Sequence, residues 1–350
     1  MSSATPTTVL DSLNLGLHRA LRDNPKVYLL GEDILDPYGG AFKVSRGLSS
    51  AFHERVITTP ISEAGITGIA GGMALRGLRP VVEIMFGDFS TLIADQVINH
   101  LAKFQMMYHQ QVSVPVVIRT PMGGRRGYGP THSQTLEKFF LGVPGLRVLA
   151  PFHLLGDHPL GAPGQLLYEA ILTSDSPILF IENKLQYLLK LLKPSDLAEF
   201  ELREFLNEHN QRFATYLFSI RSAPKAHITL AAYGYMAHLA LQAMLKLAYE
   251  HEIFCELLIP TLLAPFELTP LYDSIAATGR LLTVEEGTLS MGWGAEVLAR
   301  AIQALGPSLR QARRVAAKET VIPAAPQLEA DCLPNTVDII SSVREMVLER

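Results

Sequence analysis

The chain has 350 residues, a hydrophobic content of 48% and a formal net charge of −4 at pH 7. One hydrophobic core rarely supports so long a chain, so we expect two domains, and the apolar content argues against disorder. Charges of both signs are interspersed and no apolar stretch reaches the ~18 residues of a membrane span, which argues against nucleic acid and membranes as partners. The N-terminus lacks a basic region followed by an apolar block, so we expect a cytoplasmic protein.

Short apolar runs rich in β-branched residues alternate with segments of helical length in the first half. Apolar residues at positions 9, 13, 17 and 21 have helical spacing and predict an N-terminal helix. The apolar runs predict strands over 27–31, 56–59, 80–86, 115–120, 146–150 and 177–182, and the segment 91–107 is predicted as a helix. This alternation is typical of a doubly wound, largely parallel α/β sheet covered on both faces.

The alternation breaks over residues 191–225, a charged segment without a strand signature. We interpret it as an interdomain linker, part of it helical. Strands are then predicted over 227–233, 253–259 and 279–286, with a helix over 235–251 between the first two. The sequence therefore predicts a first domain over 1–190 and a second, smaller α/β domain over 226–350.

A lone carboxylate stands at the start of the apolar segment TPISEAGITGIAGGMALRGLRP. A strand ends just before it, so Ser62 is the predicted N-cap and Glu63 lies in the first turn of a helix. Ligands of open α/β sheets bind at the carboxyl ends of strands, but a first-turn Glu also complements the helix dipole, worth ~0.3–1 kcal/mol. Taken alone, the segment favours the second interpretation. Gly65, Gly68 and Gly72 leave one helix face open to close approach by this domain or by another subunit.

Two further segments follow strand ends. The strand predicted over 80–86 ends at Phe86, and Phe89 stands in the turn that follows; by themselves both are more typical of a core. His132 lies in TPMGGRRGYGPTHSQ, a glycine-rich loop that matches neither a Walker A loop nor GxGxxG. An isolated His is as often structural as catalytic, but ordering such a loop is costly, which favours catalysis for His132.

Several longer motifs occur together and in a fixed order. They are GED, YGGAFKV, TPISEAGITGIAGGMALRGLRPVVEIMFGDF, DQVINHLAK, GYGPTHSQ, VPGLRVLAP, PILFIENK, VEEG and GWGAE. With these motifs in this order, the chain resembles the β subunit of the thiamin-diphosphate-dependent, decarboxylating component of 2-oxo acid dehydrogenase complexes. The resemblance implies a pyrimidine-binding domain followed by a transketolase C-terminal-like domain.

The resemblance also implies roles for individual residues. Glu63 would face N1′ of the aminopyrimidine of thiamin diphosphate, where a poorly solvated carboxyl group can share a proton with the ring. Phe89 would pack against that ring, with Ile61 and Phe86 as further cofactor-binding residues. His132 would stand over the reacting centre and either orient the substrate or assist acyl transfer.

Enzymes with this cofactor hold its diphosphate through Mg²⁺ on a GDG segment, which does not occur in the 350 residues. The resemblance therefore implies an α subunit that supplies the metal ligands, in an assembly of two α and two β subunits, and a lipoyl-bearing dihydrolipoyl acyltransferase as acyl acceptor. The expected reaction is decarboxylation of a 2-oxo acid of the pyruvate or branched-chain type, and an apolar Leu92 favours a branched or longer substrate. A non-catalytic β-like scaffold subunit and a stand-alone small-molecule binder are the alternatives.

Overall fold

The computed structural model describes residues 5–206 and 212–348, and the chain divides into two compact units. Unit 1 comprises Met1–Gly123 and Phe139–Leu192, and unit 2 comprises Gly124–Lys138 and Lys193–Arg350. The domain limits near 190 and 225 stay a prediction, and residues 207–211 of the predicted linker lie outside the described ranges. Within those ranges no helix is long and apolar enough to cross a membrane.

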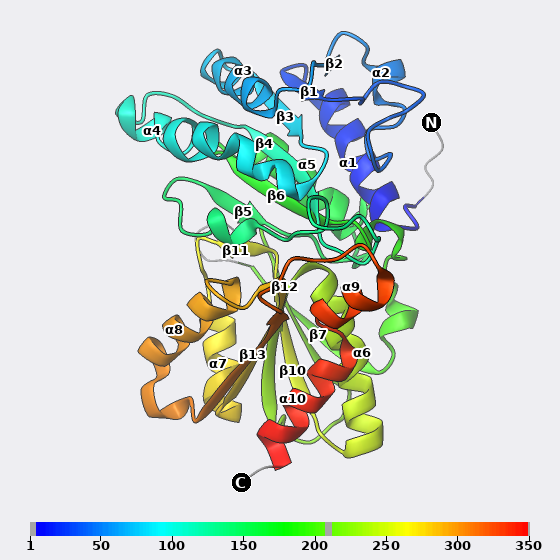
Figure 1. The fold of residues 1–350 in the computed structure, drawn as a ribbon, viewed down its shortest axis with the longest axis vertical. Coiled ribbons are helices and arrows are strands. Elements are labelled where there is room, and N and C mark those ends of the chain that lie inside the picture. Colours follow the sequence, from blue (N-terminus) through cyan, green and yellow to red (C-terminus); the bar gives the residue numbers. More distant parts are fainter. Residues whose placement is uncertain (1–4, 207–211, 349–350) are drawn as a thin grey trace. The chain divides into compact units, whose positions relative to one another are not determined.

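Unit 1 is built from alternating helices and strands (Figure 1). Its elements are α1 (Val9–Asp23), β1 (Val27–Gly31), α2 (Leu48–Ala51), β2 (Val56–Thr58), α3 (Glu63–Leu75), β3 (Arg79–Glu83), α4 (Phe104–Met107), β4 (Val117–Met122), β5 (Arg147–Leu149), α5 (Gly161–Thr173) and β6 (Ile178–Asn183). Within the unit the strands lie in the order β5-β6-β4-β3-β1-β2, and each of these neighbouring pairs is parallel. The predicted α/β class with a largely parallel sheet is confirmed.

Local sequence explains where the first helix begins and which side it buries. Thr8 caps α1, because its hydroxyl accepts from the Asp11 N–H at 3.1 Å while the Asp11 carboxylate accepts from the Thr8 N–H, also at 3.1 Å. The apolar residues with helical spacing, among them Leu13 and Leu17, are buried as the pattern predicts. Their face packs mainly against α5, beside which α1 lies in Figure 1.

The segment 91–107 was predicted as one helix, and this was wrong in detail. The structure has a 3-10 helix over Gly87–Ile93, a π-helix over Gln96–Leu101 and then α4. The strand predicted over 80–86 likewise ends at Glu83, so Phe86 lies beyond the strand rather than at its last position.

Unit 2 contains a second, mixed sheet with its own helices. Its elements are β7 (Phe200–Phe205), β8 (Thr215–Ile220), β9 (Ile228–Ala232), α6 (Gly234–His251), β10 (Cys255–Pro260), β11 (Leu262–Ala264), α7 (Thr269–Thr278), β12 (Arg280–Thr288), α8 (Trp293–Leu305), β13 (Gln311–Ala317), α9 (Pro326–Cys332) and α10 (Thr336–Leu348). The sheet order is β13-β12-β9-β10-β8-β7, and α6 and α10 lie side by side (Figure 1).

Two of these strands, β7 and β8, were not predicted from the sequence. Residues 191–225 were predicted to contain no strand, but β7 and β8 form an antiparallel pair there, and β8 also pairs antiparallel with β10. The remaining neighbours in the sheet are parallel.

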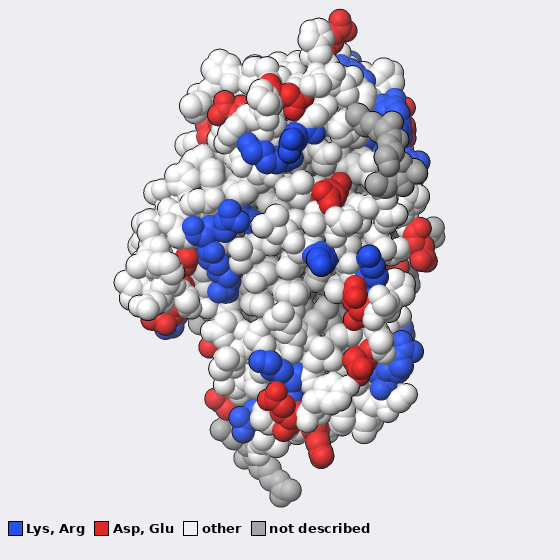
Figure 2. Space-filling view, turned by 90° about the vertical axis from the view of Figure 1, so that its right-hand side faces the viewer, with Lys and Arg blue, Asp and Glu red and all other residues white. Residues whose placement is uncertain are grey.

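On the face drawn in Figure 2, acidic and basic side chains lie interspersed among uncharged ones.

Candidate active site

Three of the predicted site residues and one further carboxylate follow three neighbouring strands of unit 1. The strands β3, β1 and β2 lie side by side and parallel. Glu32 comes directly after β1, Glu63 opens α3 after β2, and Phe86 and Phe89 follow β3. The chain passes from β1 to β2 on one side and returns to β3 on the other, so these residues follow the carboxyl ends of strands at a topological switch point. That is the usual ligand position of an open α/β sheet.

The carboxyl groups of Glu32 and Glu63 are both buried, with exposed fractions of 5% and 7%. The Ser62 N–H donates to Glu32 Oε1 at 3.3 Å, which ties the residue after β1 to the start of α3. Burial, followed by the negative charge of Glu63, raises the pKa of Glu32 above its usual value. These surroundings favour the protonated form of Glu32.

The start of α3 lies at the predicted residue but lacks a side-chain capping hydrogen bond. Ser62 is the N-cap and Glu63 the first helical residue, as predicted, but the Ser62 side chain makes no capping hydrogen bond. Ile61 just before them is 84% exposed. Of the glycines predicted to form an open face, Gly72 has no heavy atom of the described chain within 4 Å of where a Cβ would stand. A Cβ on Gly68, by contrast, would stand 3.1 Å from Gln96 Oε1, so the predicted open face is open at Gly72 and covered at Gly68.

Phe86 and Phe89 form an edge-on aromatic pair. Their ring centroids lie 5.7 Å apart at 69°, and Phe42 stands 5.5 Å from Phe86. Lys184, itself buried, places Nζ 5.4 Å from the Phe86 centroid and donates from Nζ to the Gly123 carbonyl at 2.5 Å. Both rings are half-buried, so they are neither core residues nor freely exposed.

His132 belongs to unit 2, through the segment Gly124–Lys138, whereas Glu63, Ile61, Phe86 and Phe89 belong to unit 1. The imidazole is half-buried, and its Nδ1 lies 2.9 Å from the hydroxyl oxygen of Thr131. Its backbone N–H donates to the Gly129 carbonyl at 3.4 Å. The Thr131 hydroxyl is thus one group that can orient the ring.

Two family models match this chain. Residues 6–188 match the family model described as transketolase, pyrimidine binding domain, and residues 219–339 match transketolase, C-terminal domain. The chain is 33% identical over 346 residues to the pyruvate dehydrogenase E1 component subunit beta-2, mitochondrial, of Oryza sativa subsp. japonica, covering 98% of this chain and 87% of the relative. The bovine subunit beta is 33% identical over 352 residues, with 98% and 91% covered. The chain belongs to the pyruvate dehydrogenase E1 β-subunit family.

Solved structures share the fold of this E1 β-family chain. A split-gene transketolase, described as an inactive beta4 tetramer, superposes with a TM-score of 0.73 at 18% identity and covers 98% of this chain and 99% of its own. Transketolase from Campylobacter jejuni gives a TM-score of 0.66 at 14% identity over 98% of this chain and 47% of its own. At these identities the likeness concerns the fold alone.

A second buried polar cluster of this E1 β-family chain joins the strands next to the candidate site. Arg119 of β4 donates to both oxygens of Glu182 on β6, each at 2.8 Å, and to Glu83 at the end of β3, also at 2.8 Å. Tyr187 donates to Glu182 at 2.5 Å, and the Ser45 hydroxyl donates to Glu83. Although burial works against the charged form, Glu182 and Glu83 raise the pKa of Arg119 above its usual value. The forked geometry is that of an ionised pair.

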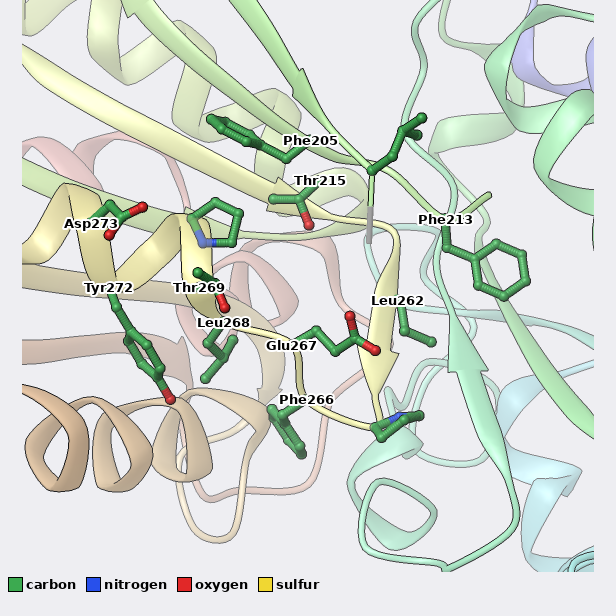
Figure 3. A pocket seen from close by; sticks show the side chains of 13 residues that line it. Phe205, Phe213, Thr215, Leu262, Phe266, Glu267, Leu268, Thr269, Tyr272 and Asp273 are labelled. Atoms are coloured by element: carbon green, nitrogen blue, oxygen red, sulfur yellow. The ribbon is translucent and has the colours of Figure 1, made fainter. Parts of the chain in front are cut away.

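One pocket of unit 2 contains none of the predicted site residues of this E1 β-family chain. It measures about 580 Å³ and lies wholly in unit 2 (Figure 3). Aromatic side chains of β7 and of the segment before α7, including Phe205 and Phe266, share its wall with Glu267. None of the five predicted site residues is among the residues that line it.

Among the described residues no group of three or more His, Cys, Asp or Glu is placed to hold a metal ion.

Proposed function

We propose that this chain is the β subunit of a thiamin-diphosphate-dependent 2-oxo acid dehydrogenase. Together with an α subunit it decarboxylates a 2-oxo acid of the pyruvate or branched-chain type and transfers the acyl group to lipoamide. The observation that carries the proposal is the buried Glu63 at the start of α3, beside Glu32, in a chain of the E1 β family.

The residues of unit 1 fit one half of the cofactor. An aminopyrimidine is a flat ring with a basic nitrogen, and unit 1 offers half-buried aromatic rings and a buried carboxyl group that can hold a proton at that nitrogen. We assign Glu63 to N1′, and Phe89, Phe86 and Ile61 to the ring. When bound, thiamin diphosphate supplies the electron sink for decarboxylation. Glu63 then controls a proton, and Glu32 helps to retain it.

The partners follow from the same proposal. Mg²⁺ and the contacts to the diphosphate are assigned to the α subunit, since the 350 residues contain no GDG segment. We propose two α and two β subunits, with a lipoyl-bearing dihydrolipoyl acyltransferase as acyl acceptor. A cytoplasmic location is part of the proposal, although the plant and mammalian relatives are named mitochondrial.

The alternative is a non-catalytic β-like scaffold subunit. Such a subunit needs neither a buried acid pair at a strand end nor an imidazole on a glycine-rich loop. Both features are present here, as Glu32 with Glu63 and as His132. They support the catalytic proposal over the scaffold.

Reconstitution tests the proposal directly. The purified chain is titrated with thiamin diphosphate and Mg²⁺ by calorimetry, alone and with its α subunit, and the complex is assayed for CO₂ release from pyruvate and from branched-chain 2-oxo acids. We expect weak or undetectable binding by the chain alone and a large gain in affinity with the α subunit. Tight Mg²⁺-dependent binding of thiamin diphosphate by the isolated chain would contradict a cofactor site that the α and β subunits form together. A folded complex inactive on every 2-oxo acid would favour the scaffold.

His132 is tested by comparing two assays on one His132→Ala preparation. If His132 steers the substrate, CO₂ release measured with an artificial electron acceptor falls. If it serves acyl transfer, that assay is nearly unchanged while the overall reaction of the complex collapses. We favour the second outcome because decarboxylation depends mainly on the cofactor. Unchanged rates in both assays would remove His132 from the site.

A further inference from the structure

The glycine-rich segment that leads to His132 is held by two buried glutamates from distant parts of unit 2. Glu286, near the end of β12, accepts from the Gly124 N–H at 2.7 Å. Glu329 in α9 accepts from the Arg125 N–H through Oε1 at 2.8 Å and from the Gly127 N–H through Oε2 at 3.1 Å. Glu286 is only 6% exposed and Glu329 only 3%. Both Glu329 oxygens are thus used to bind the backbone of one loop.

The fit between this loop and α9 is close. A Cβ on Gly124 would stand 2.6 Å from Leu333 Cδ1, and one on Gly127 would stand 3.3 Å from the Ala324 carbonyl oxygen. The Arg125 side chain adds a hydrogen bond to the Pro334 carbonyl. Residues on both sides of α9 and within it therefore contact the loop.

The backbone itself requires such support. Arg125 has φ of 65°, a left-handed conformation that is unfavourable for a non-glycine residue and persists only where its surroundings determine it. Gly127 and Gly129 also have positive φ, at 67° and 74°. Without the carboxylates, a loop so rich in glycine has many other conformations available to it.

The held segment continues directly into the histidine. The His132 N–H donates to the Gly129 carbonyl, two residues beyond the second amide bound by Glu329. We propose that Glu329 and Glu286 are positioning residues that fix the loop backbone over 124–129 and thereby set where the His132 imidazole stands. The kinetic part of this proposal rests on the proposed function, whereas the restraint on the loop does not.

The test compares Glu329→Gln with Asp331→Asn in the complex assembled with the α subunit. Glutamine has the shape of glutamate, but its NH₂ group must face one of the two backbone N–H donors, so one hydrogen bond is lost. Asp331 lies in the same helix with its side chain exposed, so its variant makes the same change of charge without touching the loop. Glu329→Asp, which keeps the charge but withdraws the oxygens by one methylene, serves if Glu329→Gln does not assemble.

Two measurements are made on each variant. Hydrogen exchange of peptides spanning 124–134 should accelerate at least about tenfold in Glu329→Gln, as expected for one lost charge-assisted hydrogen bond, and should be unchanged in Asp331→Asn. The kcat/KM of the overall reaction per folded site should fall about tenfold or more, with unchanged affinity for thiamin diphosphate. A merely structural role would lower the yield of folded protein but leave kcat and KM per folded site as they were.

Each result decides one part of the inference. Equal exchange in the Glu329→Gln and Asp331→Asn variants would overturn the restraint on the loop. Faster exchange with unchanged kinetics would show that the restraint on the loop does not affect catalysis. If the wild-type complex decarboxylates no 2-oxo acid, the proposed function fails, and the exchange measurement still decides whether Glu329 holds the loop.

Discussion

Unit 1 holds two groups of buried acids in opposite surroundings. Glu83 and Glu182 form ion pairs with the guanidinium of Arg119, whereas Glu32 lies near a second acid, Glu63. Burial raises the pKa of Glu182 and the Arg119 cation opposes that rise, whereas the charge of Glu63 adds to the rise that burial causes in the pKa of Glu32. The first arrangement is suited to joining strands, and the second is suited to proton transfer.

Unit 2 repeats the second arrangement at two residues that are not among the predicted site residues. Glu137 accepts from the Tyr233 hydroxyl at 2.7 Å, and Gly294 donates its N–H to Glu285 at 3.0 Å. Burial, followed by the charge of Glu137, raises the pKa of Glu285 to about 8, and burial also raises the pKa of Glu137. Within the described ranges, one carboxyl oxygen of each residue has no hydrogen-bond partner. Two neighbouring buried acids are therefore not by themselves a sign of catalysis. Mutation has to show which of the two pairs takes part in the reaction.

The largest expected effect is on the rate. Glu63→Gln should lower decarboxylation by ~10²–10⁴ while leaving fold and assembly intact, because an amide cannot exchange the proton that the carboxyl group holds. CO₂ release by the reconstituted complex measures it, with exposed Glu54→Gln as the control. Near-normal turnover would show that Glu63 only complements the dipole of α3.

The next effect is on stability. Arg119→Met leaves Glu83 and Glu182 buried without their guanidinium and should cost about 3–5 kcal/mol of unfolding free energy. Chemical denaturation of the assembled protein measures it, and adding Glu182→Gln to the variant should recover part of the loss. A cost below about 1 kcal/mol would mean that the cluster contributes little to joining the strands.

The smallest effect is on the pH dependence of stability. The folded-state pKa of Glu285, about 8, lies above the usual value of 4.5, so its contribution to stability is complete below about pH 4.5 and is lost as the pH rises through 8. Wild-type protein should therefore melt several degrees lower at pH 9 than at pH 6. Glu285→Gln should reduce this difference, and exposed Glu250→Gln should not. Parallel curves for all three proteins would show that Glu285 does not titrate in this range.

Sequence reasoning succeeded where the signal is local. Buried parallel strands such as β1 and β6 read as apolar runs, and a strand followed by Ser62 and Glu63 marked the start of α3. It failed at β7, because an antiparallel edge strand with one solvent face carries charged residues in every other position or nearly so. The sequence FELREF resembles a charged linker for that reason.

The candidate site shows the same limit. Glu63 and His132 stand in distinctive motifs, so the sequence singled them out. Glu32 and Glu329 act through backbone amides that lie 30 and about 200 residues away in the chain. Neither residue type nor spacing indicates which distant N–H a buried glutamate accepts from, so only the three-dimensional structure reveals those roles.

The division of the chain bears on how the protein is made. Gly124–Lys138 belongs to unit 2, but residues of unit 1 come both before and after it. On the ribosome this segment emerges about two hundred residues before the end of the chain, and at ~5–20 residues per second α9 follows it only after roughly ten to forty seconds. The sequence of unit 1 is therefore complete while Glu329, which binds this segment, has not yet been synthesised. A fragment that begins at Lys193 would lack this segment altogether, so the two units cannot be separated by a single cut.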